Sequence, residues 1–253
     1  MRIDLNADVG ESFGVYTLGA DEELLDWVTS ASIACGFHAG DPATMRTTAA
    51  LCVQKSVAIG AHPGLPDRMG FGRRAMNVTP QETHDLVVYQ VGALHAVVHA
   101  MGGTLRHVKL HGALYNMVSS DPRLADAVAS AVKTAAPGLR LFALAGSEQV
   151  SAAQRLGLEV TREAFVDRTY QPDGSLTPRD RPDALIANIP DRVRQGLGLV
   201  CDGRVVSADG TVVEVQADTL CVHGDDPDAV AVARALRQAL GDAGVTVVAP
   251  ESV

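Results

Sequence analysis

Residues 31–41 read ASIACGFHAGD, an apolar run that ends within a few residues in a histidine close to glycines. The same pattern returns as VAIGAHPG around His62, HVKLHGALY around His111 and TLCVHGD around His223. Short, continuously apolar runs are typical of strands buried in a parallel sheet. In a parallel barrel, the functional groups lie at the carboxyl ends of the strands, where the strand-to-helix loops converge. We therefore predict that these four histidines mark the rim of one site.

The rest of the chain alternates short apolar runs with helix-like segments. Strands are predicted over residues 3–7, 32–35, 57–61, 107–110, 139–143, 159–165, 219–222 and 245–248. Helices are predicted over residues 21–28, 42–55, 80–100, 123–134, 147–156, 182–197 and 228–243. This alternation indicates an α/β protein whose parallel sheet closes into a seven- or eight-stranded, TIM-like (β/α) barrel, with an open doubly wound sheet as the alternative. Residues 1–253 are predicted to form a single domain.

One segment does not follow this alternation of strands and helices. Residues 204–218 alternate apolar and polar side chains around Asp209-Gly210, which is the pattern of a β-hairpin. We expect this small hairpin, near residues 204–217, as an insertion before the seventh strand.

Composition narrows the function classes. The formal net charge is −9 and no basic run is present, which argues against nucleic acid as a partner. No stretch approaches the ~20 apolar residues of a membrane span, and the start MRIDLNADVGE lacks the apolar core of a signal peptide. A cytoplasmic protein is therefore expected. The four cysteines are widely spaced and are predicted to be buried thiols.

Polar groups at the strand ends supply the candidate catalytic residues. Lys109 and His111 lie two residues apart, so they share one face of their strand. The set of candidates is Asp8, His38, His62, Lys109, His111, Asp167 and His223. Asp8 or His111 is the candidate base, and Lys109 is a cation able to neutralise a carboxylate or polarise a carbonyl. His107 precedes its strand end and is expected away from the site, whereas His95 and His99 are expected on a solvated helix face.

Two loops carry further polar groups. Residues 64–74, GLPDRMGFGRR, place arginines beside glycines, an arrangement that suits a carboxylate or a phosphate. Residues 162–179 form a long loop with a turn at 172–174, a candidate flap over the mouth of the barrel. The sequence contains neither G-x-x-x-x-G-K-[ST] nor G-x-G-x-x-G, so no familiar nucleotide fingerprint is present.

Six blocks carry a family resemblance along nearly the whole chain: IDLNADVGE, IACGFHAGDP, AIGAHPGLPDRMGFGRR, HVKLHGALYN, DRTYQPDGSLTPR and CVHGDDPDA. The chain resembles the LamB/YcsF lactam-utilisation family, which includes the A subunit of the bacterial ATP-dependent 5-oxoprolinase. The family usually has proline where Leu110 stands and FADR where this chain has FVDR. Neither difference removes a titratable group.

The resemblance implies a barrel related to the glycoside hydrolase/deacetylase superfamily. It also implies opening of the lactam ring of 5-oxo-L-proline (pyroglutamate) to L-glutamate, coupled to hydrolysis of ATP bound with magnesium, in a complex with subunits B and C. On this hypothesis Lys109, with His38 or His62, supports the reacting carbonyl. The candidate substrate-binding residues are Asn6, Glu11, Arg73, Tyr115 and Arg168.

Two other classes of function stay open. Asp8, His38 and His62 are candidate ligands for a metal-dependent deacetylase or amidohydrolase. The second alternative is a scaffold subunit without catalysis, although a polar pocket is not what a scaffold needs. Because no phosphate cradle is found, we expect the partner subunits to activate the substrate and this chain alone not to hydrolyse 5-oxoproline at a useful rate.

Overall fold

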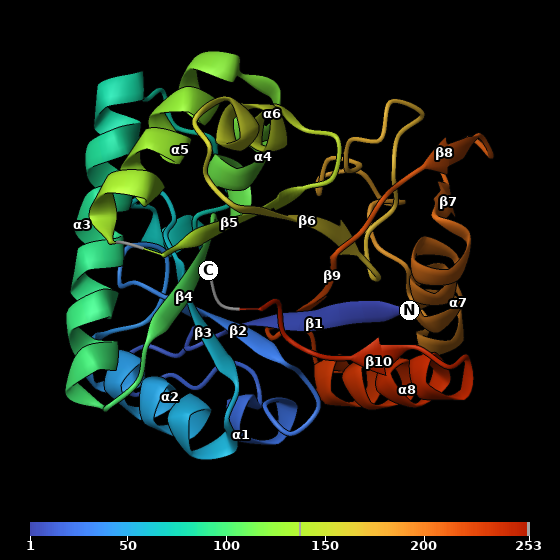
Figure 1. Ribbon diagram of the computed structural model, residues 1–253, viewed down its shortest axis with the longest axis horizontal. Coiled ribbons are helices and arrows are strands. Elements are labelled where there is room, and N and C mark those ends of the chain that lie inside the picture. The colour runs from blue at the N-terminus through green and yellow to red at the C-terminus, as the bar shows by residue number, and fades with distance from the viewer. Residues whose placement is uncertain (137, 252–253) are drawn as a thin grey trace.

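Seven parallel strands close into a barrel in the computed structural model, which describes residues 1–136 and 138–251 (Figure 1). The ring consists of β1 (Arg2–Val9), β2 (Ser30–Ala34), β3 (Ala58–His62), β4 (Leu105–Lys109), β5 (Arg140–Leu144), β6 (Val160–Phe165) and β9 (Thr219–His223). Strand β9 pairs with both β6 and β1, which closes the ring. The eighth predicted strand, β10 (Thr246–Val247), pairs with the first residues of β1. The predicted TIM-like barrel is therefore confirmed, with seven strands in the ring.

Helices surround the barrel, as Figure 1 shows. They are α1 (Asp21–Leu24), α2 (Pro42–Lys55), α3 (Pro80–Ala100), α4 (Gly112–Ser120), α5 (Pro122–Ala135), α6 (Glu148–Arg155), α7 (Ile189–Leu197) and α8 (Ala229–Asp242), with the short turns η1 (Arg68–Gly70) and η2 (Gly198–Asp202). Helices α2 and α3 have the predicted bounds because their caps are strong. The Asp41 carboxylate accepts from the first backbone N–H groups of α2, and Thr79 and Glu82 form a capping box on α3.

Two helix predictions needed correction, and one helix was not predicted. Helix α1 ends at Leu24 rather than at residue 28. Helix α7 begins at Ile189 rather than at residue 182, because the Asn188 side chain caps it by accepting from the backbone N–H of Asp191. Helix α4, which the sequence analysis did not predict, begins directly after His111. The predicted hairpin is confirmed as the antiparallel pair β7 (Arg204–Val206) and β8 (Val212–Glu214), which precedes β9.

Polar side chains also occupy the interior of the barrel below the site. The Asp4 carboxylate on β1 accepts hydrogen bonds from the hydroxyls of Thr29, Ser30 and Thr219 at 2.6–2.7 Å. His107 is buried and stacks on Phe142 with ring centroids 4.0 Å apart. It lies away from the main cavity, as predicted.

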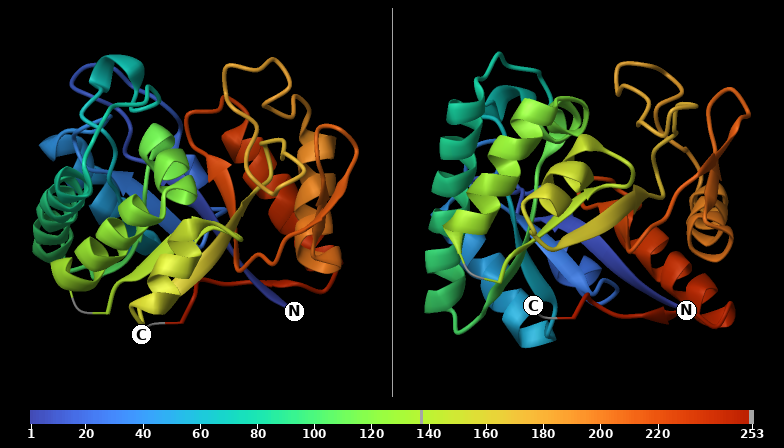
Figure 2. Two further views of the ribbon diagram at one scale, coloured as in Figure 1. Left: turned by 90° about the horizontal axis from the view of Figure 1, so that it is seen from above. Right: turned by 45° about the horizontal axis from the view of Figure 1, so that its top comes forward.

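The loops that follow the strands gather on one side of the barrel. In both views of Figure 2 the loop before α3 and the gold loop between β6 and α7 rise on the side opposite the start of β1. His95 and His99 on α3 are exposed, as predicted. Within the part of the chain that the structure describes, no helix has the length and apolar character needed to span a membrane.

Candidate active site

A cavity of about 400 Å³ lies at the carboxyl ends of the strands. Five of the predicted catalytic residues line it: Asp8, His62, Lys109, His111 and His223. Three of the predicted substrate-binding residues line it as well: Arg73, Tyr115 and Arg168. His38 lies behind His111, with the two rings stacked at 3.7 Å between centroids. Three of the four histidines predicted at the rim therefore line the cavity, whereas His38 is buried behind one of them.

The Lys109 side chain is the centre of one half of the site. Its ammonium lies 2.8 Å from Asp8 Oδ1 and 2.8 Å from Glu163 Oε1. It also donates to Asn6 Oδ1 at 3.0 Å and to Cys221 Sγ at 2.9 Å. An ammonium has three hydrogens, so these neighbours already use its donor capacity. Lys109 therefore acts mainly as the counter-charge of two buried carboxylates.

This ion cluster determines the protonation of its members. Burial alone lowers the pKa of Lys109, but the Asp8 and Glu163 carboxylates, with a further contribution from Cys221, outweigh it and raise the pKa well above its ordinary value. Burial likewise raises the pKa of Asp8, but His62 and Lys109 outweigh it and leave that pKa well below its ordinary value. Asp8 is thus a stable carboxylate with little tendency to take a proton, which makes it a weak general base.

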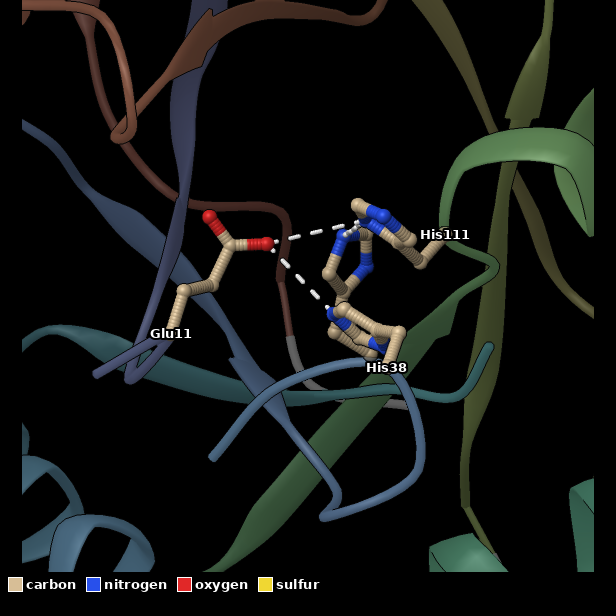
Figure 3. Close-up of side chains that lie close together, drawn as sticks. Glu11, His38 and His111 are labelled. Atoms are coloured by element: carbon tan, nitrogen blue, oxygen red, sulfur yellow. Dashed lines mark hydrogen bonds and ion pairs between the residues drawn. The ribbon is translucent and has the colours of Figure 1, made fainter. Parts of the chain in front are cut away.

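Three imidazoles and a carboxylate form the other half of the site, the imidazole cluster: Glu11, His38, His62 and His111. One donor atom from each of these four buried residues lies within 4.8 Å of the others. Figure 3 shows the Glu11 carboxylate facing the edges of the stacked His38 and His111 rings, at 3.4 Å from His38 Nε2 and 3.6 Å from His111 Nδ1. Burial is the main reason that the pKa of His38 and that of His111 lie well below the ordinary value, which keeps both rings neutral.

The glycines beside the histidines make room for these rings. A Cβ on Gly64 would lie 2.6 Å from His38 Nδ1, and one on Gly72 would lie 2.7 Å from His38 Cβ and 2.8 Å from His111 Cδ2. Gly72 also has a φ of +64°, which a residue with a side chain rarely adopts. Each glycine therefore serves the packing of a histidine from another motif, in addition to the turn of its own loop.

A third group joins two strands and the long loop. His223 Nδ1 lies 2.6 Å from Asp167 Oδ2, and the Arg179 guanidinium donates to His223 Nε2 at 2.9 Å. Because a guanidinium only donates, Nε2 accepts and Nδ1 carries the proton that it donates to Asp167. Burial raises the pKa of Asp167, but the interaction with His223 outweighs this and lowers it, so Asp167 is a carboxylate.

The two loops differ in what their arginines do. Arg73 donates to Asp225 Oδ2 at 2.8 Å at the edge of the cavity, and it is part-exposed. Arg168 lines the cavity too, but its guanidinium donates to the backbone carbonyls of Thr177 and Ala184. Arg168 therefore holds the predicted flap in shape, and the flap in turn brings Leu176, Pro178 and Arg179 to the cavity.

Comparison with known proteins agrees with this geometry. Residues 3–253 match the family described as LamB/YcsF. The chain belongs to the LamB/YcsF family. It is 55% identical over 97% of both chains to the A subunit of the 5-oxoprolinase from Bordetella pertussis, and 54% identical to that from Bacillus subtilis over 98% of this chain and 96% of the other.

Solved structures extend the comparison to the fold. The lactam utilization protein from Thermus thermophilus is 46% identical over 99% of this chain and 100% of the other, with a TM-score of 0.92. The catalytic domain of a peptidoglycan N-acetylglucosamine deacetylase from Eubacterium rectale aligns over 98% of this chain and 88% of the other, at 11% identity and a TM-score of 0.53, which shows a shared fold alone. The expected relation to deacetylase-like barrels is thus confirmed for the architecture.

Sequence reasoning about this LamB/YcsF protein missed some members of the site. Glu163, two residues before the end of β6, was expected among the polar groups at the strand ends and Arg179 in the flap, but neither was assigned a role. Asn6, Glu11 and Tyr115 were predicted to bind substrate. Asn6 and Tyr115 donate to the Glu163 carboxylate at 2.9 and 2.8 Å, respectively, and Glu11 faces the imidazole cluster.

The cysteine prediction is only partly right. Cys35, Cys52 and Cys221 are buried thiols, whereas Cys201 is exposed in η2. Burial raises the pKa of Cys35 and that of Cys52 to about 12. It also raises the pKa of Cys221 well above its ordinary value, despite the nearby Lys109. These three thiols are therefore poor nucleophiles.

Proposed function

We propose that this chain is the A subunit of an ATP-dependent 5-oxoprolinase, in which it opens the lactam ring of 5-oxo-L-proline to give L-glutamate. The names of relatives at about 55% identity over nearly the full chain support this proposal. The cofactor is ATP with magnesium, and the partners are subunits B and C of the same enzyme. Neither loop contains a nucleotide fingerprint, so we assign the activation of the lactam by ATP to the partner subunits.

The observation that carries a hydrolytic role is the chain of contacts Asp167–His223–Arg179. Asp167 holds the Nδ1–H tautomer of His223, which leaves Nε2 as the atom that accepts a proton. In the structure Arg179 donates to that atom. A substrate carboxylate attracts the Arg179 guanidinium, and its departure from His223 frees Nε2 for a water molecule. Substrate binding and activation of the base are then the same event.

The mechanism follows from this movement of Arg179 away from His223. Arg179, assisted by Arg73 at the edge of the cavity, holds the carboxylate of 5-oxoproline. His223 Nε2 removes a proton from water, and the resulting hydroxide adds to the ring carbonyl carbon that ATP has activated. The C–N bond of the lactam then breaks, and the nitrogen takes the proton held on His223 Nε2 to become the amine of glutamate. The phosphoryl group that ATP left on the carboxyl oxygen is released as inorganic phosphate when a second water attacks it. Among the possible bases, His223 is favoured over Asp8, which Lys109 holds as a carboxylate, and over His111, whose ring nitrogens face Phe71 and His62.

The test uses the complete enzyme. The chain is co-purified with subunits B and C, and glutamate release from 5-oxoproline is measured with and without ATP. We expect ATP-dependent release from the complex, a loss of about 10²-fold or more in His223→Asn, and an unchanged rate in the exposed control His95→Asn. A complex that releases no glutamate contradicts the proposed reaction. A His223→Asn complex at the wild-type rate contradicts the assigned base, and robust turnover by the isolated chain contradicts the division of labour.

A further inference from the structure

The imidazole cluster contains buried ring nitrogens and a carboxylate oxygen that have no hydrogen-bond partner among the described residues. His62 Nδ1 lies 2.8 Å from the backbone carbonyl of Lys109, and His111 Nε2 lies 2.7 Å from that of Phe71. A carbonyl oxygen only accepts, so each of these ring nitrogens carries a hydrogen. When both rings are neutral, as metal ligands must be, the opposite nitrogens, His62 Nε2 and His111 Nδ1, carry lone pairs. These two lone pairs face each other at 3.0 Å. His62 Nε2 also lies 3.4 Å from Asp8 Oδ2.

The remaining two residues are equally unsatisfied. His38 is 1% exposed and Glu11 is 5% exposed. Among residues 1–136 and 138–251, no group forms a hydrogen bond with either ring nitrogen of His38 or with Glu11 Oε1. Buried polar atoms without partners are rare in proteins and call for an explanation such as an ion. Here one electron-pair donor from each of four residues points into the same small space.

We propose that Glu11, His38, His62 and His111 bind one divalent transition-metal ion of the zinc class. Two ligand nitrogens at the usual Zn–N distance in a tetrahedral site lie about 3.3 Å apart. The separations of 3.0, 3.4 and 3.6 Å within the cluster bracket that value. Three neutral imidazoles with one carboxylate are a donor set that zinc accepts well.

Two of the three histidines have the surroundings of metal ligands. In most such sites, a ligating histidine donates its second N–H to a carbonyl or a carboxylate, which fixes the direction of the coordinating nitrogen. The carbonyls of Lys109 and Phe71 do this for His62 and His111. His62 and His111 also line the cavity, so a bound ion would be accessible from it and would supply Lewis acidity there.

A second group of potential metal ligands lies beside Lys109, but it is a poorer site for a cation. Asp8, Cys221 and His223 also lie within ligand distance of one another. The Lys109 ammonium, however, lies 2.8 Å from Asp8 and 2.9 Å from Cys221, so a positive charge already occupies that place. The proposed ligand set therefore differs from the set Asp8, His38 and His62 expected from the sequence. Both sets contain His38 and His62, but Glu11 and His111 replace Asp8.

The experiment measures the metal and not the activity, so its result does not depend on the proposed reaction. The full chain is purified without an affinity tag, stripped with a chelator and titrated with Zn²⁺, and separately with Co²⁺, whose visible absorption reports a tetrahedral site. We expect one equivalent of Zn²⁺ or Co²⁺ per chain and a rise in the thermal midpoint on binding. Glu11→Gln and His38→Ala are expected to weaken binding by more than the 10–100-fold that loss of a hydrogen-bonding partner behind a ligand costs.

Two control variants make the outcome decisive. Cys221→Ser, in the second group, and His95→Ala, on the surface of α3, are expected to bind Co²⁺ as the wild type does. Circular dichroism of each metal-free variant confirms that it is folded before titration, and Glu11→Gln retains the size of the side chain if His38→Ala does not fold. A folded wild-type chain that binds neither ion, or binding that is lost in Cys221→Ser but kept in Glu11→Gln, would overturn the proposal.

Discussion

The buried carboxylate of Asp4 provides a quantitative test of the barrel interior. Burial is the main cause that raises its pKa from 3.8 to about 6, although three hydroxyls donate to it. A raised pKa means that the folded state prefers the protonated form. This preference contributes to the free energy of unfolding. The contribution is fully present below pH 3.8, the pKa of the carboxyl in the unfolded chain, and is lost as the pH rises through about 6. The difference corresponds to about 3 kcal/mol at neutral pH.

The substitution Asp4→Asn removes the cost of ionising a buried carboxyl group, but it disturbs one hydrogen bond. Thr219 donates to the carboxylate and already accepts from Asn6, so an amide NH₂ at position 4 leaves the Thr219 hydroxyl hydrogen without its acceptor. That loss costs about 1 kcal/mol. We therefore expect Asp4→Asn to be about 2 kcal/mol more stable than the wild type near pH 7, and to lose the advantage near pH 4.

Urea unfolding at both pH values measures the difference. Glu159→Gln, an exposed carboxylate on the surface, serves as the control and should leave the difference between the two pH values unchanged. Stability curves of Asp4→Asn and wild type that stay parallel from about pH 4 to about pH 7 would refute the assignment of a raised pKa to Asp4.

Three further predictions concern the site. Lys109→Met leaves two buried carboxylates without a counter-charge and should lower the free energy of unfolding by about 3–5 kcal/mol, measured by urea titration. Gly72→Ala, at a φ of +64° and with its Cβ 2.7 Å from His38 Cβ, should destabilise the protein by more than about 1 kcal/mol, whereas Gly241→Ala, with open space around it, should not. Arg179→Gln should raise KM for 5-oxoproline in the complex, and an unchanged KM would remove Arg179 from substrate binding.

The sequence was sufficient to predict where the polar groups would meet, because strand order and direction follow from the alternation of apolar runs and helices. The carboxyl ends of parallel strands converge whatever the loops contain, so placing His62, Lys109 and His223 together required no knowledge of side-chain contacts. The role of Glu163 was missed because its partner Lys109 lies 54 positions away in the chain, and the sequence does not show that the two side chains pair. Arg179 was missed because its approach to His223 depends on the path of a long irregular loop, and periodicity does not determine such a path.

Strand positions also could not predict which polar groups pair within the site. Lys109 connects its two halves, the ion cluster around the ammonium and the imidazole cluster. Its ammonium lies 2.8 Å from a carboxylate oxygen of Asp8 and of Glu163, while its backbone carbonyl accepts from His62 Nδ1. The same residue thus determines the charge of one half and the tautomer of the imidazole that faces the other. Because a backbone carbonyl survives side-chain substitution, Lys109→Met disturbs the carboxylates directly but leaves the hydrogen bond that orients His62. The chemistry of the two halves is therefore separable by mutation even though one strand end builds both.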